Sequence, residues 1–144
     1  MGLLLGMIAL VPTSALSGGP PTYTCQISVS AEFNDYGYGQ DLTNWNLTFG
    51  SCTPTTLLDL APSYNLFGFT LNLGVTLTDA SGQNHCVGCN IGVQIPALET
   101  GYPFTASTSV SNVPAGTYAL TITSPIPIGS NSGPKTVTQT VSVP

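Results

Sequence analysis

Residues 22–33 read TYTCQISVSAEF, and apolar and polar side chains alternate along this stretch. One parity is apolar and consists of Tyr23, Cys25, Ile27, Val29, Ala31 and Phe33. A period of two is typical of a strand with one face on a core and the other in water. We therefore predict a half-buried β-strand here.

The same alternation recurs along the rest of the chain, and no helical pattern of useful length interrupts it. The further predicted strands are Leu42–Phe49, Phe67–Leu77, Val87–Ile95, Tyr102–Val110, Gly116–Thr123 and Thr136–Val143. Trp45, Leu47 and Phe49 are expected to point inward, and Gly50 indicates a bulge. About seven short strands without helices predict an all-β fold, a single antiparallel β-sandwich over residues 22–144.

The stretch SVSNVPAGTYALTIT, Ser109 to Thr123, resembles a hairpin that recurs in immunoglobulin-like and transthyretin-like surface modules of prokaryotes. The resemblance covers about a tenth of the chain. It implies an immunoglobulin-like fold and carries no information about activity.

Charged side chains are scarce, which limits the functions open to this chain. Among its 144 residues Lys135 is the only Lys or Arg and His85 the only His, and the net charge is −5. Such a chain has no basic surface for nucleic acid and few groups for acid–base catalysis. We expect a protein that is not an enzyme, with no cofactor, no metal and no nucleic-acid partner, and we place Lys135 in a solvated turn.

Residues 1–21 form an apolar arm and linker. The run LLLGMIALV ends at Pro12, too short for a membrane span, which takes about 20 apolar residues. One interpretation is a secretory signal peptide cleaved near Thr13-Ser14-Ala15, although a positively charged start is missing. We favour a retained strand that completes a neighbouring subunit. Its polymerising residues are Leu3, Leu4, Leu5, Met7, Ile8, Leu10 and Val11.

Four cysteines, Cys25, Cys52, Cys86 and Cys89, are an even number that suits two disulfides in an oxidising compartment. If the first two strands form a hairpin, residue 25 lies opposite roughly residue 50, within a bulge of Cys52. Cys25–Cys52 and Cys86–Cys89 are then the expected pairs. Zinc bound by the four cysteines is the alternative, but only one CxxC is present.

Two surface features suggest contact with sugars. Asn46-Leu47-Thr48 is an N-glycosylation sequon, and its parity puts Asn46 on the solvent face. The loop Asn34–Asp41 is expected to be a solvated turn. Its Tyr36 and Tyr38, with Trp45, could alternatively form an aromatic platform for a sugar ring.

These features favour a structural subunit of an extracellular filament, a homopolymer of β-sandwiches joined by the N-terminal strand. The architecture resembles the donor-strand filaments of archaea and bacteria. The alternatives are a secreted carbohydrate-binding or adhesion module, and a viral or S-layer-like coat component.

Overall fold

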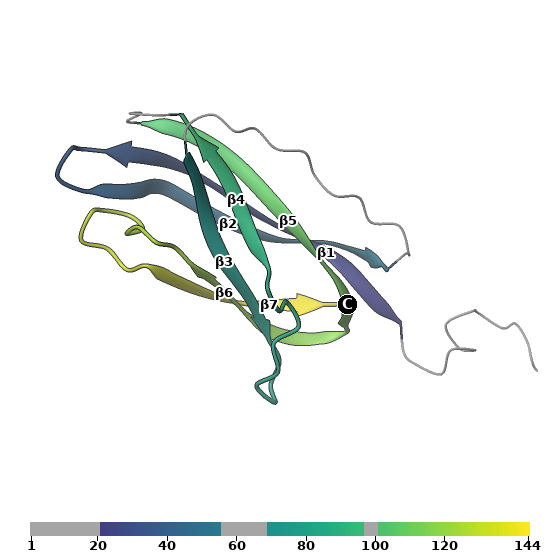
Figure 1. The fold of residues 1–144 in the computed structure, drawn as a ribbon. Coiled ribbons are helices and arrows are strands. Elements are labelled where there is room, and N and C mark those ends of the chain that lie inside the picture. Colours follow the sequence, from purple (N-terminus) through teal and green to yellow (C-terminus); the bar gives the residue numbers. More distant parts are fainter. Residues whose placement is uncertain (1–20, 56–68, 97–100) are drawn as a thin grey trace, which may run out of the picture.

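The computed structural model describes residues 21–55, 69–96 and 101–144, in which every regular element is a β-strand (Figure 1). The predicted strand Leu3–Val11 and the predicted first residue of the third strand, Phe67, lie outside these ranges. The strands are β1 Thr22–Asp35, β2 Gln40–Pro54, β3 Phe69–Thr78, β4 Asn90–Ile95, β5 Tyr102–Pro114, β6 Gly116–Thr123 and β7 Thr136–Val143.

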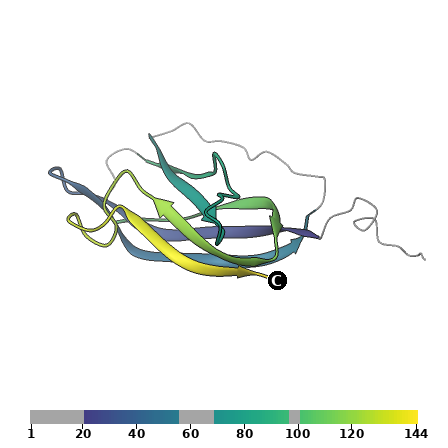
Figure 2. The same cartoon turned by 90° about the horizontal axis from the view of Figure 1, so that it is seen from below.

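These strands form two antiparallel sheets that pack face to face (Figure 2). One sheet has the order β2-β1-β5 and the other has the order β4-β3-β6-β7. The predicted β-sandwich of about seven strands is therefore confirmed. In immunoglobulin domains the second strand is internal to its sheet. Here the first strand is central, and β2 lies at an edge.

The core lies between the sheets and is built from alternate residues of their strands. Ile27, Val29, Leu73, Leu77, Leu120 and Ile122 are fully buried. The outer faces carry Ser, Thr and Asn instead. Thr76, Thr121 and Thr138 are neighbours across three strands, and the last two hydroxyl groups are 3.1 Å apart. Hydroxyl groups are thus the polar groups that bond to water on a surface with almost no charge.

Three bulges interrupt the pairing of β1 with its neighbours. Each contains a residue in the left-handed region, namely Asn44, Ser51 or Asn112. The predicted bulge near Gly50 is present, with Ser51 and Cys52 facing the single residue Cys25. This extra residue brings Cys52 level with Cys25, so the bulge positions the disulfide.

The stretch Ser109–Thr123 does not form a hairpin, because β5 and β6 lie in different sheets. Only Ala115 separates the two strands. The hydroxyl group of Tyr118 donates a 2.6 Å hydrogen bond to the carbonyl oxygen of Pro114. This backward bond at the start of the sixth strand is similar to the tyrosine corner known from immunoglobulin-like sandwiches. The stretch Ser109–Thr123 therefore carries the chain from one sheet to the other.

The predicted strand Val87–Ile95 begins three residues late, at Asn90. Val87 was expected to point inward but is 83% exposed, whereas Cys86 is buried. The disulfide between Cys86 and Cys89 closes the chain into a tight turn, and Val87 lies at its tip. Ring closure overrides the alternation that the sequence shows at this position.

Candidate functional site

Both expected disulfides are formed. Cys25 and Cys52 join β1 to the edge strand β2 with a Cα–Cα distance of 4.0 Å. Cys86 and Cys89 close the turn before β4. No cysteine remains free, so thiolates are not available to hold zinc. Two disulfides are typical of proteins outside the reducing cytosol.

The loop Asn34–Asp41 was predicted to be solvated, but the two residues at its base are buried and hydrogen-bonded. Asn34 and Asp41 are buried, and the Asn34 side-chain amide donates a 2.8 Å hydrogen bond to Asp41 Oδ1. The same amide donates to the Thr43 hydroxyl group at 3.0 Å. The Asn34 side-chain oxygen Oδ1 accepts from the backbone N–H of Gly101 at 2.9 Å. This network fixes the hairpin against the start of β5.

The tip of the hairpin carries an exposed aromatic pair. The rings of Tyr36 and Tyr38 are stacked with centroids 5.8 Å apart, and the two residues are 41% and 80% exposed. The Tyr36 hydroxyl group contacts Asp41 Oδ1 at 3.4 Å. Burial and the nearby Asp41 raise the pKa of Tyr36, so the phenol of Tyr36 stays neutral at physiological pH.

Trp45 does not belong to this platform, because its ring packs against the core. Its indole Nε1 is buried and has no hydrogen-bond partner among the described residues. The prediction that Trp45 points inward with Leu47 and Phe49 is thereby confirmed. Trp45 is unsuited to stacking on a sugar.

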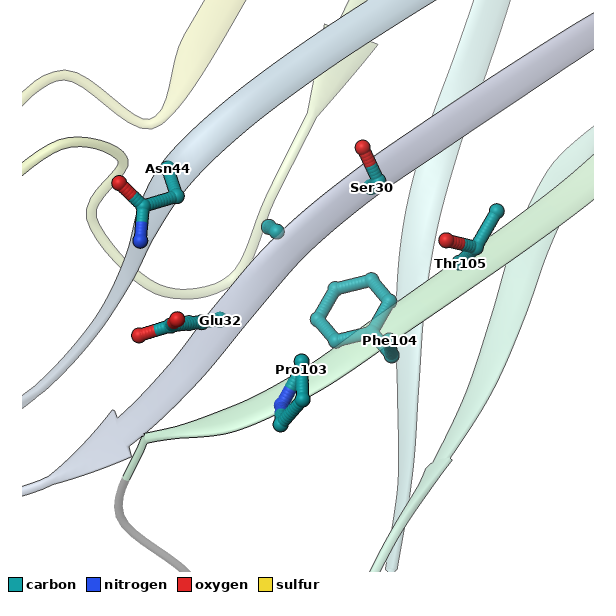
Figure 3. Close-up of a pocket in the computed structure, with 7 residues that line it drawn as sticks. Ser30, Glu32, Asn44, Pro103, Phe104 and Thr105 are labelled. Atoms are coloured by element: carbon teal, nitrogen blue, oxygen red, sulfur yellow. The ribbon is translucent and has the colours of Figure 1, made fainter.

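A shallow depression lies on the outer face of the three-stranded sheet. Figure 3 shows Glu32 from β1, Asn44 from β2 and Pro103 from β5 around it. Glu32 is the only titratable group that lines it, so it offers no pair of groups for acid–base catalysis. Asn46 is exposed on the same face, opposite Ser30. Its exposure suits the sequon, and its glycosylation remains a prediction.

A second polar cluster, which sequence reasoning missed, lies in the turn after β3. Asp79 Oδ2 accepts a 2.7 Å hydrogen bond from His85 Nε2. Asp79 Oδ1 accepts from the Ser81 hydroxyl group at 2.6 Å and from the backbone N–H of Gln83 at 3.0 Å. The His85 ring lies edge-on to Tyr118, with centroids 5.3 Å apart. The spacing Asp-x5-His across a turn that contains Gly82 is the sequence pattern that could have predicted this cluster.

This cluster is built to hold a charged carboxylate. Hydrogen bonds from Ser81, then His85 and Gln83, hold the pKa of Asp79 well below its usual value. Burial, and secondarily Asp79, raise the pKa of Tyr118. The Ser81 hydroxyl group bonds to Asp79 rather than to His85, so the three side chains do not form a nucleophilic triad. The cluster stabilises the turn.

Asp79→Asn is expected to lower the free energy of unfolding at pH 7. The free energy of unfolding of this variant should also decrease less as the pH is lowered. The folded pKa lies below the unfolded value of 3.8, so this stabilisation is complete above about pH 4. It is lost as the pH falls further, towards the folded pKa. Denaturant unfolding between pH 7 and pH 2 measures the effect. Glu32→Gln is the control on the outer sheet face, and an equal response of both variants would contradict the prediction.

The described residues contain no cluster of three or more His, Cys, Asp or Glu side chains that could hold a metal ion. Lys135 is exposed just before β7, as predicted, and its carbonyl oxygen accepts from the backbone N–H of Ser124. Within residues 21–55, 69–96 and 101–144, no helix has the length and apolar character needed to cross a bilayer.

The edges of the sheets are the remaining candidate for a site of interaction. Strands β2 and β7 end their respective sheets and lie beside each other (Figures 1 and 2). Backbone hydrogen bonds link this side of the sandwich at Leu42, which bonds to Pro127 and Gly129 of the loop before β7. Natural proteins usually protect such edges with charges, prolines or bulges. The eight residues of β7 contain no charge and no proline, and pair with β6 without a register shift.

Comparisons with protein-family models, curated proteins and solved structures give no match.

Proposed function

We propose that this chain is the structural subunit of an extracellular filament. It polymerises when the apolar strand Leu3–Val11 of one copy enters the sandwich of another. The observation that carries the proposal is the unprotected edge of β7, whose N–H and C=O groups form a template for a further strand. None of the eight residues of β7 is charged, so no charge within this strand opposes pairing.

The energetics of strand addition suit a durable polymer. Burial of a nine-residue apolar strand contributes on the order of 10 kcal/mol at about 25 cal/mol per Å², before entropy costs. Contacts made of backbone hydrogen bonds and apolar side chains are insensitive to salt. The disulfides would hold each subunit folded outside the cell.

Sedimentation and negative-stain microscopy test the proposal. The full chain is expected to form filaments, and a variant without residues 3–11 is expected to stay monomeric. The double variant Leu5→Asp with Ile8→Asp keeps the length of the arm and should also stay monomeric, because two carboxylates cannot be buried in an apolar groove. A monomeric full chain, or filaments of the deletion variant, would rule out strand donation.

A secreted carbohydrate-binding module is the second candidate, and the stacked pair Tyr36–Tyr38 favours it. Two exposed rings at a hairpin tip offer a flat apolar surface for a sugar. If the full chain stays monomeric, carbohydrate binding replaces filament formation as the proposed function. No corresponding observation favours a viral or S-layer-like coat component.

A further inference from the structure

We infer that the donated strand enters a second copy of this chain between its edge strands β2 and β7, a position termed the gap. There it runs antiparallel to both strands. This inference rests on the proposed function and adds the position and direction of the strand.

The strand directions distinguish this gap from the opposite side of the sandwich. Strands β2 and β7 run the same way in Figure 1, and the isolated bridge between Leu42 and Ile128 is likewise parallel. One added strand can therefore pair antiparallel with both edges and join the two sheets. On the other side β4 and β5 run in opposite directions. A strand added there would be parallel to one of its neighbours, and parallel pairing is slightly less stable.

The inner faces of the two edge strands are incompletely covered along the gap. Trp45 and Phe49 of β2 and Val137 of β7 are only partly buried. Gln139 pairs with the fully buried Leu120 and shares its parity with Val137 and Val141, yet it is exposed. The inner face of β7 is thus uncovered at Gln139, and apolar side chains from a further strand would cover this row.

Length and charge match the proposed occupant. The eight residues of β7 span about 27 Å, and the nine residues Leu3–Val11 span about 30 Å as a strand. No charged residue occurs in β7 or in β2 after Asp41, and none occurs in Leu3–Val11. Neither side buries a charge when the strand enters.

The linker favours a second copy over the chain's own arm. Tyr23 pairs with Pro54, so β1 begins at the end of the gap where β2 finishes. A strand antiparallel to β2 has its last residue at the opposite end. The ten residues between Val11 and Thr22 would have to return the whole 27 Å, which uses most of their limit of about 36 Å. Donation to a neighbour requires no such return.

Three lysine substitutions in the full chain test the position of the strand. Gln139→Lys places a charge in the inner row at a site that is exposed in the subunit, so folding is retained. Thr140→Lys, on the outer face of the same strand, is the matched control. Thr108→Lys tests the inner face of β5 on the opposite side. Thermal unfolding verifies that each variant is folded.

We expect Gln139→Lys to reduce sedimenting filaments about tenfold or more, because insertion would bury the ammonium group. Thr140→Lys and folded Thr108→Lys should form filaments as the unaltered chain does. Filaments of Gln139→Lys at the normal level, or loss of filaments in Thr140→Lys as well, would overturn the assignment to this gap. Either result would leave strand donation intact, because the unaltered chain still polymerises. Failure of the unaltered chain to polymerise would instead refute the proposed function.

Discussion

Replacement of both Cys25 and Cys52 by alanine is expected to lower the free energy of unfolding by about 3.5 kcal/mol. The two cysteines are 27 residues apart, and their bond closes a loop around the β1–β2 hairpin. Loss of the bond releases this loop in the unfolded chain, whose entropy rises. The bond also anchors the edge strand β2 at a bulge. Urea unfolding without reductant, on protein whose disulfides are verified by mass, measures the change.

The pair Cys86→Ala with Cys89→Ala is the matched control. These cysteines are only 3 residues apart, so the same chain-entropy argument gives about 2 kcal/mol. The effect should therefore be smaller and local to the turn before β4. Equal losses from the two double variants would show that loop length does not determine the stabilisation.

Leu73→Ala is expected to cost about 2–5 kcal/mol. Leu73 is 0% exposed in β3, an internal strand of the four-stranded sheet, and lies opposite the buried Ile91. Truncation removes apolar contacts and leaves a cavity that packed strands cannot close. The midpoint of denaturant unfolding measures the loss.

Val87→Ala is the control for this core substitution, because Val87 is 83% exposed at the tip of the disulfide turn. Its effect should stay within about 0.5 kcal/mol. A loss of less than about 1 kcal/mol for Leu73→Ala would contradict the core position of β3.

The strands could be predicted from the sequence because a side-chain period of two is a local property. The predicted boundaries of β6 and β7 agree with the structure, and Cys25–Cys52 followed from counting residues around one hairpin. The start of β4 was wrong, since ring closure by Cys86 and Cys89 outweighs the alternation at Val87. A covalent constraint of this kind does not appear in a hydrophobic pattern.

The polar clusters were harder to predict, since their partners meet only after folding. The loop Asn34–Asp41 looked solvated, yet Asn34 bonds to Asp41 and to Gly101, which is 67 residues away. His85 and Asp79 are near in sequence, but Tyr118 reaches them from another strand. Hydrogen bonds between distant segments depend on strand order, which composition and period do not specify.

By itself the sequence determined the fold class, the pairing of the cysteines and the near absence of charge, because each depends on residue type and short-range spacing. Only the tertiary structure decided which strands lie at the edges. It placed β1 between β2 and β5, and it set β2 and β7 beside each other with the same direction. The order of strands within a sheet depends on long-range packing between the two layers. For that reason an alternating pattern reveals the strands but not which of them lie at the edges of the sheets.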